Sequence, residues 1–282
     1  MKAFASYDGT RLAYDEVGSG SRLVCLPGGP GRASAYLEDL GGLVSSRTLI
    51  RLDGRATGRS EVPADPTTLR YDRLAADVEA LRCELGEDQL DLLAHSAGCL
   101  TAQAWAAAHP ERVRSLVLVT PSGRLQGSAY GDLANLIAAR AHEPWYADAR
   151  AALDALDDCT PAERQGLLRA IRPFMYGTWD ERTQEHAASA DRQSSRRAEM
   201  GFRAADGDVD VKGMLAALGR LSAAVLVLAG GRDALTGIEA AEDVAACFAT
   251  AQLVTLPSAG HFPWVDDPEG FRDAVADFLA RR

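Results

Sequence analysis

The sequence predicts an α/β fold in which a mostly parallel sheet is covered by helices on both faces and carries a helical cap inserted after the sixth strand. Two observations lead to this prediction. Short apolar runs typical of strands alternate with helix-like segments in both end parts of the chain. Between Thr120 and about Leu221 there is no strand-like run, and the apolar residues show helical spacing instead. We therefore expect residues 1–120 and 222–282 to form the core and residues 121–221 to form the cap.

Hydrophobic periodicity and turn residues predict the elements in order. Alternation on either side of Asp8-Gly9-Thr10 predicts a hairpin of residues 3–7 and 11–16. The other predicted strands are residues 22–26, 48–52, 90–93, 113–119, 224–228 and 252–256. The predicted helices outside the cap are residues 71–85, 97–108, 240–248 and 268–279. A chain of 282 residues can bury enough surface in such a domain to need no metal or disulfide for stability.

Charge and cysteine content exclude several classes of function. The net charge is −10, from 40 acidic and 30 basic residues, with no basic stripe, which argues against a nucleic-acid partner. The five cysteines are widely spaced and form no C-x-x-C pair, so we interpret them as small apolar residues rather than a disulfide framework or zinc site. No apolar run is long enough to span a membrane. We expect a cytoplasmic protein that acts on a small molecule or a short peptide.

The strongest chemical signal is the segment Leu92-Leu93-Ala94-His95-Ser96-Ala97-Gly98-Cys99. It places a serine in a sharp turn between an apolar strand and an Ala-rich helix, with small residues two positions before and after it. Ser96 is therefore a candidate nucleophile, and the backbone N–H of Ala97 is a candidate oxyanion donor at the helix start. Ala94 stands where the pattern G-x-S-x-G has its first glycine. The alternative interpretation of Ser96 is a simple helix N-cap.

An acid and a base follow two later strands. Asp233 ends the strand-turn sequence Val225–Asp233, and His261 ends Leu253–His261. Nucleophile, acid and base then follow strands in the order Ser, Asp, His, at the sheet edge where α/β proteins bind ligands. His261 would take and return the proton of Ser96, and Asp233 would orient the imidazole.

Other candidate groups fit a structural role better. The strand that ends at Thr120-Pro121-Ser122 offers no carboxylate, and Asp266 and Asp267 suit the start of a helix. We interpret His95 as a packed neighbour of the nucleophile, and His142 and His186 as surface residues of the cap.

A glycine turn supplies the second oxyanion donor. The segment Pro27-Gly28-Gly29-Pro30-Gly31 follows a strand, and its backbone can approach a substrate closely. We predict that Gly29 N–H faces Ala97 N–H across the oxyanion and that Gly28 contacts the substrate. The turn matches neither nucleotide-binding fingerprint, because no G-K-[ST] or G-x-G-x-x-G follows. Whether the Gly29–Pro30 bond is cis or trans stays open.

These motifs, in this order, resemble the α/β-hydrolase superfamily and most closely the proline iminopeptidases. The resemblance rests on the glycine turn, the loop Asp53–Ser60, the serine turn, Gly230-Gly231-Arg232-Asp233 and Gly260-His261. The chain departs from the family pattern at Pro27, where the family has His, and at Ala56 and Ala94, where it has Gly. We interpret the loop Asp53–Ser60 as structural.

The resemblance implies a serine hydrolase that releases a small N-terminal residue from a peptide or amide. It also implies that acidic cap residues bind the free amino group of the substrate, and Asp180 and Glu199 are the two candidates. Both could instead lie on solvated helix faces.

Two other functions remain open from the sequence. The same three residues would serve a carboxylesterase, thioesterase or lactonase acting on a small molecule, and a scaffold of this kind could bind a ligand without catalysis. No metal or organic cofactor is implied, because the triad and the oxyanion donors complete the machinery. The sequence leaves the oligomeric state open.

Overall fold

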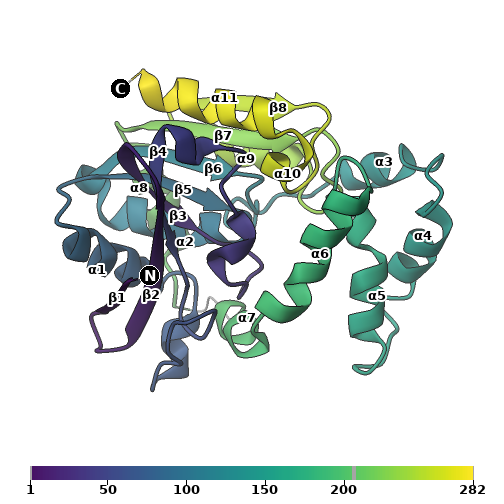
Figure 1. The fold of residues 1–282 in the computed structure, drawn as a ribbon, viewed down its shortest axis with the longest axis horizontal. Coiled ribbons are helices and arrows are strands. Elements are labelled where there is room, and N and C mark those ends of the chain that lie inside the picture. The colour runs from purple at the N-terminus through teal and green to yellow at the C-terminus, as the bar shows by residue number, and fades with distance from the viewer. Residues whose placement is uncertain (1, 205–207, 282) are drawn as a thin grey trace.

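The computed structural model describes residues 2–204 and 208–281, and one eight-stranded sheet runs through it (Figure 1). The strand order is β1-β2-β4-β3-β5-β6-β7-β8; β1 and β2 are antiparallel to their neighbours and all other pairs are parallel. The strands are β1 (Lys2–Ala5), β2 (Arg11–Gly18), β3 (Ser21–Leu26), β4 (Arg47–Leu52), β5 (Leu90–His95), β6 (Val113–Val119), β7 (Ala224–Gly230) and β8 (Ala251–Leu256). The predicted α/β fold with a mostly parallel sheet is confirmed, and β1 and β2 form the predicted hairpin.

Two apolar layers cover the sheet because successive side chains of each buried strand face opposite sides. In β5, Leu92 belongs to the apolar layer that also contains residues of α1 (Ala75–Leu85), α2 (Gly98–Ala108) and α9 (Glu239–Ala246). Leu93 packs on the other face with α11 (Pro268–Ala280), which Figure 1 shows across the sheet from α1 and α2. The predicted helix over residues 71–85 begins only at Ala75, because the residues before it form turns. The short helix α10 (Pro263–Asp266) was not predicted.

The segment between β6 and β7 is helical. It contains α3 (Leu133–Ala138), α4 (Tyr146–Asp154), α5 (Arg164–Ala170), α6 (Glu181–Gln193), α7 (Arg196–Phe202) and α8 (Val211–Leu218). Ile137, Ala149, Ile171 and Phe174 form an apolar cluster of their own beside the sheet. The last helix, α8, packs instead against α2 and adds Leu218 to the core. Figure 1 shows α3, α4, α5 and α6 together at one end of the sheet.

Backbone hydrogen bonds join this helical segment to the loops that follow the strands. In the loop after β3, Ala33 N–H donates to the Gln193 carbonyl at 2.9 Å, and the Gly31 carbonyl accepts from Ser195 N–H at 2.8 Å. After β7, Ala234 N–H donates to the Phe174 carbonyl at 3.2 Å. After β8, His261 N–H donates to the Met175 carbonyl at 2.7 Å. The helical segment is therefore fastened to three loops at one edge of the sheet.

The loop Asp53–Ser60 has a structural role, as expected from the sequence. Arg55 is 1% exposed, and its guanidinium makes two hydrogen bonds of 2.7 Å to the carboxylate of Asp77 and two more to the carboxylate of Asp8. The Asp53 carboxylate accepts hydrogen bonds from the backbone and hydroxyl of Ser34. These bonds tie the loop to the body of the protein. No helix among the described residues is both long and apolar enough to cross a membrane.

Candidate active site

Ser96 lies in the turn between β5 and α2. Its φ angle is +52°, a left-handed conformation that is unusual for a residue other than glycine and marks a strained turn. Close packing explains the small neighbours, because a Cβ on Gly98 would lie 2.4 Å from the carbonyl oxygen of Pro27. Ala94 is fully buried in the core, so a methyl group fits where the pattern has glycine. The turn is therefore tight at position 98 but not at position 94.

Asp233 and His261 follow β7 and β8 and are joined by a hydrogen bond of 2.8 Å between Asp233 Oδ2 and His261 Nδ1. Their side chains are 0% and 3% exposed. Asp233 also accepts hydrogen bonds from Leu235 N–H at 2.8 Å and from the Thr236 hydroxyl at 2.6 Å. Burial alone would raise the pKa of Asp233, but His261 and these donors hold it below its usual value. The pair is thus an ionised carboxylate that orients an imidazole.

Ser96 and His261 line the same cavity, which has a volume of about 300 Å³. No hydrogen bond holds the Ser96 hydroxyl within residues 2–204 and 208–281. His261 uses Nδ1 for Asp233, which leaves Nε2 as the nitrogen for a proton of the serine. Such a contact often tightens only when a substrate is bound. The structure therefore brings all three predicted triad residues to one site.

The two predicted oxyanion donors line a second cavity of about 350 Å³, together with Ser96. In the described chain, neither Gly29 N–H nor Ala97 N–H has a backbone or side-chain acceptor. The φ of Gly29 is +120°, a conformation that favours glycine, and the Gly29–Pro30 bond is cis. Gly28 lies behind the nucleophile rather than in either cavity, since a Cβ on it would be 2.9 Å from Ser96 Cβ. Gly28 therefore lines neither cavity, and its contact with a substrate stays a prediction.

A buried Tyr–His pair supports the turn and was not predicted from the sequence. Tyr36 Oη lies 2.7 Å from His95 Nδ1 and accepts a hydrogen bond of 2.6 Å from Gly28 N–H. His95 Nε2 is 2.9 Å from the carbonyl oxygen of His261, which can only accept, so Nε2 carries the proton. Burial, and secondarily the charge of His261, lower the pKa of His95 well below its usual value. A neutral His95 thus links the glycine turn to the backbone of the base.

The expectation that His186 lies on the surface is wrong. His186 is 3% exposed, accepts a hydrogen bond from Tyr176 Oη at 2.8 Å and donates one to the Tyr36 carbonyl at 2.9 Å. His186 lies in α6, and α6 packs against the residues that follow β3. The side chain of His186 therefore faces the core. His142, in contrast, is exposed as expected.

We expect the burial of His186 to make stability depend on pH. Burial lowers its pKa from 6.5 to about 4, so the unfolded chain binds more protons between these values and stability falls as the pH drops through this range. Between pH 7 and pH 5, this group should lower the unfolding free energy of the wild-type protein by roughly 2 kcal/mol. His186→Gln should not show this decrease. Urea unfolding at both pH values measures this. His142→Gln is the control, and an equal pH dependence in wild type and His186→Gln would contradict the expectation.

The two acidic cap candidates do not converge on the site. Asp180 is exposed and caps α6, where its carboxylate accepts a hydrogen bond from Thr183 N–H at 3.0 Å. It does not line either cavity beside Ser96. Glu199 does line the cavity that holds His261, but it is half exposed and lies 3.4 Å from Arg203. Of the two acids expected from the family resemblance, only Glu199 therefore lies at this site.

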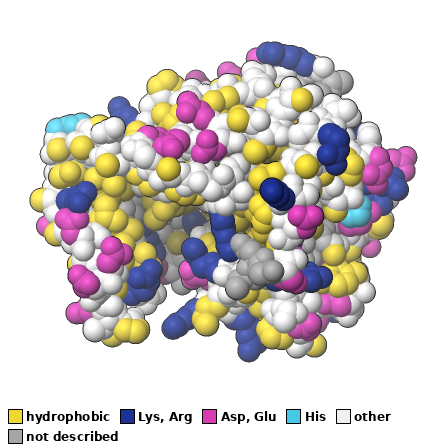
Figure 2. Space-filling model, turned by 180° about the vertical axis from the view of Figure 1, so that it is seen from behind, with side chains coloured by type: hydrophobic (Ala, Val, Ile, Leu, Met, Phe, Trp, Pro, Cys, Tyr) yellow, Lys and Arg dark blue, Asp and Glu magenta, His cyan; other side chains and the backbone are white. Residues whose placement is uncertain are grey.

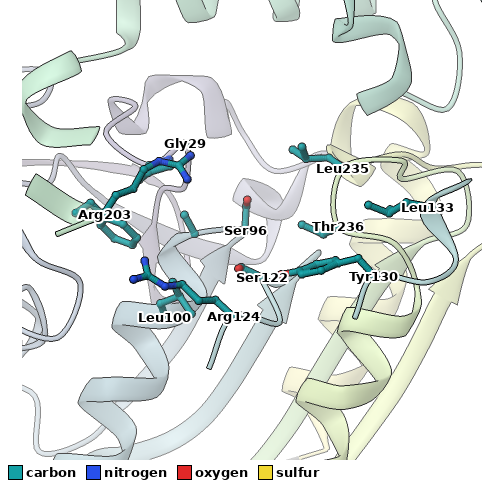
Figure 3. Close-up of a pocket in the computed structure, with 13 residues that line it drawn as sticks. Gly29, Ser96, Leu100, Ser122, Arg124, Tyr130, Leu133, Arg203, Leu235 and Thr236 are labelled. Carbon is teal, nitrogen blue, oxygen red and sulfur yellow. The ribbon is translucent and has the colours of Figure 1, made fainter. Parts of the chain in front are cut away.

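Arginines carry most of the charge around the two cavities. Their described lining includes Arg32, Arg124, Arg172 and Arg203 but only one carboxylate, that of Glu199. Figure 3 shows Ser96 between Arg203 and Arg124 on one side and Leu235 and Thr236 on the other. Figure 2 shows a hollow on one face of the molecule with basic side chains in it. The charged lining of the site is therefore mostly basic, although the whole chain has a net charge of −10.

The described residues form neither a metal-binding cluster nor a disulfide. No group of three or more His, Cys, Asp or Glu side chains there could hold a metal ion. The five cysteines are free, and burial raises the pKa of Cys25 and Cys99, which keeps these thiols protonated.

Comparison with known proteins is consistent with this geometry. The model of the alpha/beta hydrolase fold family matches residues 21–268. A pimeloyl-[acyl-carrier protein] methyl ester esterase of Chromobacterium violaceum is 31% identical over 77% of this chain and 79% of its own length. A proline iminopeptidase of Heyndrickxia coagulans is 32% identical, but the match covers only 43% of either chain. Among solved structures, proline iminopeptidase from Mycobacterium smegmatis has a TM-score of 0.74 over 99% of this chain and 98% of its own, at 22% identity.

Proposed function

The chain belongs to the α/β-hydrolase family, and we propose that it is a serine hydrolase that cleaves a small-molecule ester through an acyl-enzyme. The observation that carries the proposal is the buried Asp233–His261 pair at a cavity that Ser96 also lines. Relatives with esterase and iminopeptidase names agree with hydrolysis as the reaction class.

The proposed reaction has two halves. Ser96 Oγ attacks the substrate carbonyl while His261 Nε2 accepts its proton, and Gly29 N–H and Ala97 N–H donate hydrogen bonds to the oxyanion. The carbon–oxygen bond of the ester breaks, and His261 returns the proton to the leaving alcohol. Water then attacks the acyl-Ser96 ester with His261 as base, which releases the acid and restores Ser96. Asp233 stabilises the imidazolium in both halves.

The charges of the site favour an ester over a peptide with a free amino end. An ammonium group bound here would meet four arginines and one glutamate, and like charges oppose binding. Asp180, which was expected to hold that ammonium, caps a helix instead. The iminopeptidase activity suggested by the family resemblance is therefore the second candidate, and the experiment below separates the two.

Three matched substrates test the choice. p-Nitrophenyl cyclopentanecarboxylate presents an ester, cyclopentanecarboxylic acid p-nitroanilide presents a neutral anilide, and proline p-nitroanilide presents the same ring size with a free amine. We expect the ester to be cleaved, and kcat/KM for the neutral anilide to equal or exceed that for the proline anilide. A clearly higher kcat/KM for the proline anilide would instead support the hypothesis of iminopeptidase activity.

Covalent labelling tests the nucleophile independently of the substrate. A fluorophosphonate should label the wild-type protein and fail to label Ser96→Ala. Folded wild-type protein that takes up no label would support a scaffold that binds a ligand without catalysis.

A further inference from the structure

Arg32 is a buried cation that lacks a carboxylate partner. Its side chain comes from the glycine turn after β3 and is 6% exposed. Nε donates to Gln193 Oε1 at 3.0 Å, and Nη2 donates to the His186 carbonyl at 3.2 Å and to Ser189 Oγ at 2.8 Å. All three acceptors are neutral. No Asp or Glu oxygen lies within 4.0 Å of this guanidinium in residues 2–204 and 208–281.

The other buried arginines differ from Arg32 in this respect. Among the described residues, Arg55 and Arg140 are also buried. Arg55 pairs with Asp77 at 2.7 Å, and Arg140 pairs with Glu143 at 3.2 Å. A guanidinium keeps its proton in proteins, so burial without an anion carries a desolvation cost that a partner normally offsets. Among the described residues Arg32 is the exception, so its guanidinium is open to an anion that these residues do not supply.

The guanidinium of Arg32 is placed to meet that anion beside the nucleophile. It lines the cavity of about 300 Å³ that also contains Ser96 and His261. Its carbon Cζ lies 4.2 Å from the centre of the Tyr36 ring, which covers one face of the guanidinium. Nη1 has no hydrogen-bond partner among the described residues, and it is not enclosed by protein atoms. Two N–H groups are thus free to bind a ligand in the cavity.

The surroundings favour a carboxylate at the end of an apolar chain. Leu168, Ile171 and Phe262 line the same cavity and supply apolar wall. Arg172 lines it as well, but this side chain already pairs with Asp191 at 2.5 Å, so it adds positive potential rather than an open partner. A planar carboxylate matches the edge of a guanidinium, and a hydrogen bond between the two charged groups is strong in such a buried place.

We propose that Arg32 binds a free carboxylate of the substrate, so that the substrate class is the half-ester of a dicarboxylic acid. The inference rests on the proposed function and deepens it, because it places the ester carbonyl at Ser96 and the carboxylate at Arg32. Hydrolysis breaks the ester carbon–oxygen bond, consumes one water and releases the alcohol, the dicarboxylate and one proton. The carboxylate bound to Arg32 takes no part in the bond changes.

Matched substrates that differ in one charge test the proposal. The monomethyl half-esters of glutaric, adipic and pimelic acid are compared with the dimethyl diesters of the same acids, with acid release followed in a pH-stat. We expect kcat/KM for the half-ester of one chain length to exceed that of its diester by at least about tenfold, as a charged hydrogen bond allows. Arg32→Gln should lower this ratio by a similar factor. Arg150→Gln, an exposed arginine of α4 that pairs with Asp154, should leave the ratio unchanged.

A ligand competition makes the result independent of turnover and of the stability of the variant. Glutarate should slow fluorophosphonate labelling of wild-type Ser96 and raise the Tm, whereas the uncharged glutaramide should do neither. Arg32→Lys keeps the charge but loses the planar fork, and it replaces Arg32→Gln if the latter does not fold.

The outcomes separate this inference from the proposed function. If the fluorophosphonate labels Ser96 and the unlabelled enzyme cleaves diesters as well as half-esters, the role of Arg32 is overturned and the serine hydrolase stands. If Ser96 is not labelled and no ester is cleaved, the proposed function is overturned. If glutarate and glutaramide then change the Tm equally, the carboxylate site is overturned as well.

Discussion

Replacing Ser96 with alanine is expected to lower kcat for the preferred ester by roughly 10⁴- to 10⁶-fold, because no acyl-enzyme can form without the hydroxyl. The protein should still fold. The hydroxyl makes no hydrogen bond within the described residues, and alanine removes only that one oxygen from a residue that is 7% exposed. Steady-state kinetics and the Tm of both proteins measure the two effects.

Ser122→Ala provides the matched control for this result. Ser122 follows β6 and lines the cavity of about 350 Å³ that also contains Ser96, and the described lining of that cavity includes no His, Asp or Glu. This variant should retain most of the activity. Near-normal turnover by Ser96→Ala, or an equal loss in Ser122→Ala, would show that the nucleophile is assigned to the wrong serine.

Asp233→Asn is expected to lower kcat by roughly 10³- to 10⁴-fold at neutral pH while leaving KM within a few-fold. Asp233 Oδ2 accepts the hydrogen bond of His261 Nδ1, which places the free electron pair on Nε2. An asparagine amide can present its NH₂ group to Nδ1, which moves the proton to Nε2 and disables the base. It also weakens the contact with the Thr236 hydroxyl, which donates to Asp233 at 2.6 Å. A pH profile of kcat/KM for both proteins is the measurement.

Asp266 supplies the control for this acid. Its carboxylate accepts a hydrogen bond of 2.8 Å from Gly260 N–H, next to the base, and burial raises its pKa to about 6. Asp266→Asn therefore mimics the protonated, uncharged form of this carboxyl, which the wild-type residue adopts as the pH falls toward 6. Its effect on kcat should be much smaller than that of Asp233→Asn, and the reverse order would reassign the acid.

The sheet and the three proposed triad positions could be predicted because each depends on local sequence. Ser96, Asp233 and His261 all follow apolar strands, and parallel strands bring their carboxyl ends to one edge of the sheet. Ala94 departs from the pattern without consequence for the turn, since its methyl group is accommodated in the core.

The residues that shape the cavity could not be predicted because their partners are distant in the chain. Arg32 binds His186 and Ser189 on α6, more than 150 positions away, and nothing near Arg32 in the sequence indicates these contacts. Tyr36 is likewise placed by His95. The position of Asp180 could have been predicted, because Asp is a preferred residue at a helix N-cap and a helical segment follows it.

The fastening of the helical segment to the loops after β3, β7 and β8 limits how the protein can move. Swinging the whole segment away from the sheet would break four backbone hydrogen bonds at once, those that join Ala33 to Gln193, Gly31 to Ser195, Ala234 to Phe174 and His261 to Met175. At about 1 kcal/mol each, these four bonds alone would hold the open form to about one molecule in a thousand or fewer, and the bonds of Arg32 to α6 lower that population further. It would also release the backbone of His261 and of the glycine turn from contacts that position them, so we expect the closed form to be the active one. We therefore expect substrate and product to pass through the mouths of the two cavities rather than through a hinge.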